Sequence, residues 1–164
     1  MPTWERLRGA PIARHEQTYG LRFNPYPPYT ILRTDDLDSA TLQRLGRFAR
    51  YWELVGNSGR FRRGRALLLG DFPFARFLMF SDWLFATTGQ THQISQDRLF
   101  DLVYQWLIGE GGLDRDTVAA VLAEDFESSG IRSVPKFMEA DKTLLKPHPS
   151  KLNRGAGRQE RHLV

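Results

Sequence analysis

The stretch from Ser39 to Val55 reads SATLQRLGRFARYWELV and carries the clearest helical pattern in the sequence. Its apolar residues recur at steps of three and four, which places them on one face of a helix. They are Leu42, Leu45, Phe48, Ala49, Trp52 and Val55. Asp38 stands at the N-cap position, and Gly56 with Asn57 supplies a stop signal. The pattern therefore predicts an amphipathic helix from about Ser39 to Val55.

A second helix is predicted from about Phe72 to Thr87, with Asp71 as its N-cap and Pro73 in its first turn. Apolar residues occupy nearly every side of this helix, namely Phe74, Phe77, Leu78, Phe80, Trp83, Leu84 and Phe85. A helix that is apolar all round is typically buried. We therefore expect it to be central, and Trp83→Ala to cost about 3–5 kcal/mol.

Two further helices are predicted at about Gln96–Ile108, after Ser95 as N-cap, and at about Asp116–Glu127, before Gly130. Residues 57–65 are expected to form a loop, and Leu67–Leu69 is ambiguous between a strand and a helical turn. Val134, Pro135 and Phe137 are expected to pack back onto the core.

The first 34 residues have a different character, because three prolines between Phe23 and Tyr29 exclude a helix there. We expect an extended lead-in over residues 1–34, with one short strand at Tyr29–Arg33. The predicted fold class is mostly α: a small bundle of about four helices with an extended proline-rich N-terminal lead-in. The predicted divisions are residues 1–34, a helical domain at 35–140, and a basic, disordered tail at 141–164.

Composition excludes several classes of protein. The 164 residues include no cysteine, so disulfides, thiolate zinc sites, cysteine nucleophiles and cysteine-held iron–sulfur clusters are ruled out in this chain. The N-terminus lacks the apolar core of a signal peptide, and no stretch suits a membrane span. We expect a soluble cytoplasmic protein. Residues 142–164 carry a net charge of +5, whereas the whole chain carries +4, so the remaining residues sum to −1. The basic character therefore belongs mostly to the tail.

The sequence offers no complete catalytic site. The four histidines have neither metal-site spacing nor a neighbouring cysteine, and the serines lack a nucleophile-elbow context. We therefore expect no metal site and no enzyme activity from this chain alone. Asp82 lies in the aromatic-rich second helix, and a partly buried carboxylate needs a partner. We interpret it as a structural tie to an arginine of the first helix or of the loop that follows.

An arginine-rich strip is the strongest functional signal. It comprises Arg44, Arg47, Arg50, Arg60, Arg62, Arg63 and Arg65, with Tyr51, Trp52 and Phe61 interleaved. Such a strip is typical of a solvated helix face with a basic loop, of a docking surface for another protein domain, or of a surface that binds phosphates or nucleic acid.

Several motifs resemble one family. RLRGAPI at residues 6–12 is similar to a run near the end of the barrel in cobalamin-binding radical SAM proteins, although Ala10 replaces the usual Thr. A longer series of motifs in this sequence is similar to the domain of unknown function that follows that barrel. They are FNPYPPY at 23–29, QRL at 43–45, RFARYWE at 47–53, NSGRF at 57–61, FARFL at 74–78, SDWL at 81–84 and TGQTH at 88–92.

The resemblance, over about residues 5–140, implies a parent enzyme that binds a [4Fe–4S] cluster, S-adenosylmethionine and cobalamin. Its Cys-x-x-x-Cys-x-x-Cys motif and its cobalamin domain are missing here, so we expect a fragment that binds none of these cofactors. The leading hypothesis is a non-catalytic auxiliary module that packs against a radical SAM barrel or cobalamin-binding domain in cis or in trans. The alternative is a protein that binds nucleic acid or another anionic ligand through the arginine-rich strip.

Overall fold

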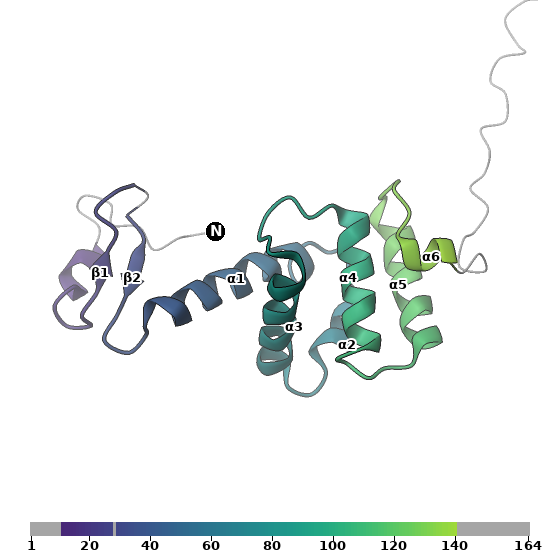
Figure 1. The fold of residues 1–164 in the computed structure, drawn as a ribbon, viewed down its shortest axis with the longest axis horizontal. Coiled ribbons are helices and arrows are strands. Elements are labelled where there is room, and N and C mark those ends of the chain that lie inside the picture. The colour runs from purple at the N-terminus through teal and green to yellow at the C-terminus, as the bar shows by residue number, and fades with distance from the viewer. Residues whose placement is uncertain (1–10, 28, 141–164) are drawn as a thin grey trace, which may run out of the picture.

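The computed structural model describes residues 11–27 and 29–140, and its fold is mostly helical, as predicted (Figure 1). Met1–Ala10 and the predicted tail at 141–164 lie outside the described residues. In chain order the elements are η1 (Pro11–His15, a 3-10 helix), β1 (Arg22–Phe23), β2 (Ile31–Arg33), α1 (Ser39–Val55), α2 (Gly64–Leu69), α3 (Pro73–Thr88), α4 (Gln96–Ile108), α5 (Arg115–Ser129) and α6 (Lys136–Ala140).

The N-terminal unit consists of η1 and a small antiparallel sheet. The predicted strand is present as β2, and it pairs with β1, which the sequence analysis did not predict. Gly20 precedes β1 with a φ of +57°, and a Cβ added there would lie 1.9 Å from Oδ1 of Asp35. The positive φ favours glycine at this position, because another residue would be strained in this conformation and would also displace the Asp35 side chain.

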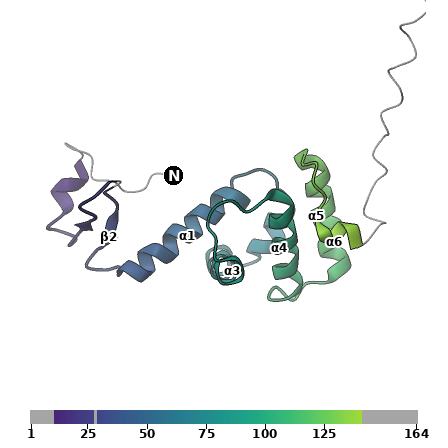
Figure 2. The ribbon, with the colours of Figure 1, turned by 45° about the horizontal axis from the view of Figure 1, so that its top comes forward.

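Helix α1 connects the N-terminal unit to the rest of the bundle, and its bounds are those predicted (Figures 1 and 2). The carboxylate of Asp38 accepts a 2.7 Å hydrogen bond from the backbone N–H of Thr41, so the predicted N-cap is correct. The C-terminal half of α1 crosses α3, and Tyr51 and Val55 are fully buried there. The N-terminal half leads to the sheet, where the Ser39 hydroxyl donates to the Leu32 carbonyl oxygen.

Helix α3 differs from its prediction in two respects. Its N-cap is Phe72, without a side-chain hydrogen bond, so the assignment of Asp71 was wrong. It is also not buried all round, since one side packs on α1, α2 and α4 while Phe72, Phe74 and Met79 are exposed. Trp83 is only partly buried, so the truncation cost predicted for a fully buried side chain no longer applies to it.

Helix α4 lies next to α3, and α5 lies beside α4 on the side away from α3 (Figures 1 and 2). Helix α2 contacts α3, α4 and α5, and α6 contacts α4 and α5. The ambiguous Leu67–Leu69 segment is helical, and α2 already begins at Gly64, so the predicted loop ends earlier. The core contains Tyr51, Phe80, Phe100 and Leu122, which come from α1, α3, α4 and α5, and Phe61, which precedes α2. Pro135 and Met138 are buried and Phe137 packs against the core, as predicted for this segment.

No helix within residues 11–27 and 29–140 combines the length and the apolarity that crossing a bilayer requires.

Candidate functional site

Arg44 and Asp82 join α1 to α3. The Arg44 guanidinium donates to both oxygens of the Asp82 carboxylate, with Nε at 3.1 and 2.9 Å, in the fork geometry that suits this pair. The Asp82 side chain is 34% exposed and the Arg44 side chain 46%. Hydrogen bonding to Asp82 raises the pKa of Arg44. The Arg44 guanidinium thus binds a carboxylate of its own chain, and the partner of Asp82 is an arginine of the first helix, one of the two possibilities that the sequence interpretation gave.

Arg47 and Arg50 also turn toward their own fold. The Arg47 guanidinium lies 4.5 Å above the centre of the Phe85 ring on α3, a cation–π arrangement. Arg50 Nε donates to the carbonyl oxygen of Thr91, in the segment between α3 and α4. The Tyr51 hydroxyl donates to the neighbouring Gln90 carbonyl oxygen at 2.7 Å, and burial raises the pKa of Tyr51. The three arginines of α1 therefore stabilise its contact with α3 and the segment that follows α3.

The start of α2 is fixed by a carboxylate that the sequence analysis did not single out. Asp125, on α5 and 2% exposed, accepts hydrogen bonds from the backbone N–H groups of Arg63 and Gly64. The Arg63 side chain forms a separate ion pair with Glu124, at 2.6 Å. Arg63 is therefore tied to α5 through both its backbone and its side chain.

Arg60, Arg62 and Arg65 form no ion pair with any residue that the structure describes, and neither do Arg47 and Arg50 of α1. Arg62 and Arg65 border a surface cavity of about 430 Å³ between the end of α1 and the start of α2. Arg65 donates a 2.9 Å hydrogen bond from one guanidinium nitrogen to the Gly56 carbonyl oxygen. The predicted strip is thus not one continuous surface, and Arg62 and Arg65 of its loop half border a cavity.

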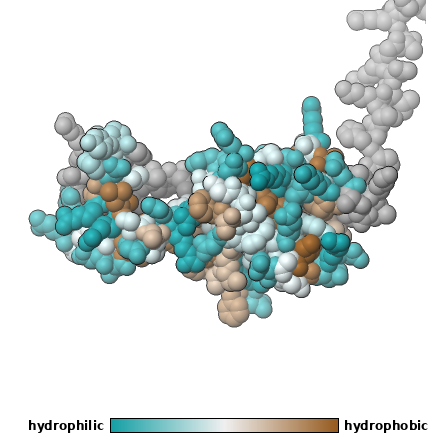
Figure 3. All heavy atoms as spheres, viewed as in Figure 1, coloured by the Kyte–Doolittle hydropathy of each residue, from teal (hydrophilic) through white to brown (hydrophobic). Residues whose placement is uncertain are grey.

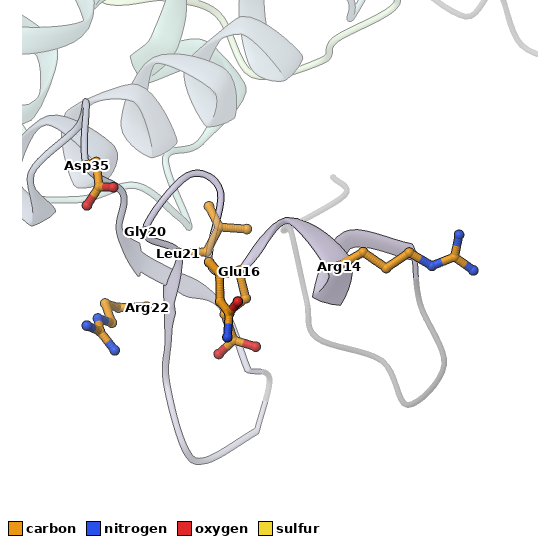
Figure 4. A pocket seen from close by; sticks show the side chains of 7 residues that line it. Arg14, Glu16, Gly20, Leu21, Arg22 and Asp35 are labelled. Atoms are coloured by element: carbon orange, nitrogen blue, oxygen red, sulfur yellow. The ribbon is translucent and has the colours of Figure 1, made fainter.

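A second cavity, of about 610 Å³, lies in the N-terminal unit between η1, β1 and the segment after β2 (Figure 4). The Arg14 side chain extends away from Glu16 and Asp35, and the labelled side chains do not converge on one point (Figure 4). This arrangement does not assemble the acid, base or nucleophile that a catalytic centre needs.

Exposed phenylalanines mark the start of α3. Phe72 is 73% exposed and Phe74 is 59% exposed. The Phe74 ring packs at 5.3 Å from the Phe48 ring of α1, which holds it against the bundle. The space-filling view shows apolar side chains that project from the end of the bundle where α3 begins (Figure 3). We call Phe72, Phe74 and the half-buried Phe48 the phenylalanine patch.

No group of three or more histidine, aspartate or glutamate side chains is placed to hold a metal ion in the part of the chain that the structure describes. His15 and His92 are both exposed; His15 ends η1, whereas His92 lies in the segment between α3 and α4. His148 and His162 lie outside the described residues.

Residues 17–161 match the model of a protein family, described as a protein of unknown function (DUF4080). The match covers most of the 164 residues. The chain belongs to the DUF4080 family. No curated protein and no solved structure matches it. The mostly helical fold, with its small two-stranded sheet, is therefore the fold of a DUF4080 domain.

Sequence reasoning missed the two buried carboxylates of this DUF4080 domain. Asp101, on α4, accepts hydrogen bonds from the backbone N–H groups of Lys136 and Phe137 and so caps α6, as Asp125 caps α2. A signal for Asp125 was present, because it follows Leu122 by three residues and therefore lies on the apolar face of α5. A carboxylate on an apolar face indicates a buried hydrogen-bonding partner.

Proposed function

We propose that this DUF4080 domain is a non-catalytic module that packs against the barrel of a cobalamin-dependent radical SAM enzyme, in the same polypeptide or in a separate one. Two observations support the proposal. The motifs in the sequence resemble the region that follows such a barrel. The domain also exposes a phenylalanine patch, and this is the observation that carries the proposal.

The physical argument rests on the cost of leaving Phe72 and Phe74 in water. Exposed apolar side chains that lie close together often mark a contact with another protein surface, and Phe72 and Phe74 are two residues apart at the start of α3. Burying one phenylalanine fully contributes about 1.5–3 kcal/mol. Phe74 is already oriented by Phe48, so less side-chain freedom is lost on association than for a mobile side chain. The patch is therefore suited to an apolar surface of a neighbouring domain.

In this proposal the chemistry belongs to the partner. A [4Fe–4S] cluster needs cysteine thiolates, and this chain contains no cysteine. S-adenosylmethionine and cobalamin would likewise bind to the barrel and to the cobalamin-binding domain. The contribution of the DUF4080 domain is to stabilise or orient those domains from outside the reacting centre.

The test is an association measurement. The chain is mixed with a purified barrel protein that carries the Cys-x-x-x-Cys-x-x-Cys motif and lacks a DUF4080 domain of its own, and the complex is followed by sedimentation velocity. We expect a one-to-one complex that the double variant Phe72→Ser/Phe74→Ser weakens by tenfold or more. Met79→Ser is the matched control, because Met79 is 58% exposed on the same helix but is not part of the patch. No complex with the wild-type chain, or equal weakening by both changes, would contradict the proposal.

Binding of nucleic acid along the whole arginine-rich strip is less well supported by the geometry. Such binding needs guanidinium groups that face the phosphates together. Arg44, Arg47 and Arg50 instead contact α3 and the segment after it, and Arg63 contacts Glu124. Tight, salt-dependent binding of RNA that Arg44→Ala and Arg47→Ala abolish in a folded chain would restore the alternative.

A further inference from the structure

We propose that the cavity between the end of α1 and the start of α2 binds a small organic phosphate, held by the guanidinium groups of Arg62 and Arg65. This binding site is separate from the phenylalanine patch and goes beyond the proposed packing role. Three features of the cavity carry the inference: the two arginines at its border, its volume, and the rigid loop that forms it.

The lining of the cavity is positively charged. Arg62 and Arg65 border it, and no carboxylate is among the described residues that line it. The nearby acidic side chains have other partners. Glu53 accepts a hydrogen bond from the Asn57 amide at 2.9 Å, and Glu124 pairs with Arg63. An anionic ligand would therefore meet two cations in the lining, while the carboxylates of Glu53, Glu124 and Asp125 lie outside it.

Val55 and Phe61 also line the cavity, but they are 1% and 2% exposed, so they form its floor and present almost no apolar surface to a ligand. The Phe61 ring is fixed in the core by the Phe100 ring, at 4.3 Å. Gly59 adds no side chain to the lining, and a Cβ built on it would meet no atom within 4 Å. The cavity volume of about 430 Å³ lies within the range of small-molecule sites. This volume is larger than a bare phosphate ion needs, so an anion that carries an organic group suits the cavity better.

The loop is held in place before any ligand arrives. The Ser58 hydroxyl accepts a hydrogen bond from the Arg60 N–H and lies 3.4 Å from the Val55 carbonyl oxygen. The bond from Arg65 to the Gly56 carbonyl oxygen orients the Arg65 guanidinium beside the cavity. Asp125 fixes the backbone immediately after Arg62. A preorganised loop reduces the entropy that binding would otherwise cost.

Phosphate is the anion that this geometry favours. A guanidinium presents several donors in a planar fork, which matches phosphate oxygens, and two guanidiniums can contact different oxygens of one phosphate. The backbone N–H groups of Arg63 and Gly64 are not available for a ligand, because the Asp125 carboxylate already accepts them. The affinity therefore depends on the two arginine side chains.

The proposal is tested by calorimetric titration of the full chain, at low ionic strength, with phenyl phosphate, inorganic phosphate and phenylacetate as probes. We expect saturable binding of phenyl phosphate that is tighter than binding of either other probe. Since hydrogen bonds to charged groups are strong, Arg62→Ala should weaken it by about 10-fold or more. Arg62→Lys should weaken it less, because the charge remains while the planar fork is lost.

Arg63→Ala is the matched control, because Arg63 is the neighbouring arginine and its side chain pairs with Glu124 instead of bordering the cavity. This variant should leave the affinity for phenyl phosphate unchanged. Equal loss in Arg62→Ala and Arg63→Ala would show that general charge explains the binding and would overturn the proposal. So would the absence of saturation with phenyl phosphate, or equal affinity for inorganic phosphate. None of these outcomes depends on association with a barrel.

Discussion

The buried carboxylate of Asp125 on α5 accepts a 2.7 Å hydrogen bond from the backbone N–H of Gly64, the first residue of α2. Oδ1 of Asp125 also accepts from the Arg63 N–H at 3.0 Å. One side chain thereby satisfies two N–H groups that the start of a helix leaves without partners. The same contact places the loop with Arg62 and Arg65 relative to α5, so it links the stability of the bundle to the proposed phosphate site.

Asp125→Asn should destabilise the fold. The amide loses the charge that strengthens both hydrogen bonds, and its NH₂ group turns a donor toward backbone donors. We expect a loss of about 1–3 kcal/mol in the free energy of unfolding, measured by urea denaturation.

The matched control is Asp82→Asn, the same chemical change at a carboxylate whose side chain is 34% exposed. Solvent screens this pair, so the expected loss is below about 1 kcal/mol. If Asp82→Asn cost as much as Asp125→Asn, the distinction between the buried cap and the surface tie would be wrong.

Trp106 and Trp83 should differ in their contributions to stability. Trp106 is 2% exposed, its ring packs edge-on against Phe80, and the Arg76 guanidinium lies over it. Trp106→Ala should cost about 3–5 kcal/mol, as large aromatic truncations in cores do. Trp83→Ala should cost clearly less, because Trp83 is partly exposed. Thermal denaturation of the two variants compares them, and a larger loss for Trp83→Ala would contradict the assignment of the core.

The N-cap of α5 should make stability depend on pH. The Asp114 carboxylate accepts hydrogen bonds from the backbone N–H and the hydroxyl of Thr117, and these hold the pKa of Asp114 below its usual range. A group whose pKa is lowered by folding stabilises the folded state above its unfolded-state pKa, which is about 4. That contribution is lost as the pH falls through the lower folded-state pKa.

Asp114→Ala should therefore lower the urea midpoint at neutral pH, and the gap between variant and wild type should narrow as the pH falls below about 4. The measurement is a pair of urea denaturation curves for each protein, one at neutral pH and one at a pH below about 4. A gap that stays constant, or widens in acid, would show that the ionised carboxylate is not what stabilises the start of α5.

Much of this fold was predictable, because α1, α4 and α5 have strong local signals. The spacing of Leu45, Phe48 and Trp52 and the capping residue Asp38 together predict α1 at its observed bounds. The side of α3 that is exposed was not predictable. Its apolar residues surround the helix, and only the placement of α1, α2 and α4 determines which of them remain in solvent.

The contacts of the arginine-rich strip were not predictable from the sequence either. Arg44 to Arg65 are close in the sequence, but their partners are distant in it: Asp82, Phe85, Thr91 and Glu124. Local spacing indicates that arginines are concentrated here, whereas only tertiary packing determines which groups each arginine contacts and which of them border a cavity.

Hydrogen–deuterium exchange of the chain alone and in the presence of a radical SAM barrel protein tests the packing role most directly. If the phenylalanine patch docks onto that barrel, amides at the start of α3, in residues 70–76, should exchange more slowly in the mixture, while amides in α5 should not change. Unchanged exchange at the start of α3, or protection confined to α5, would contradict the account.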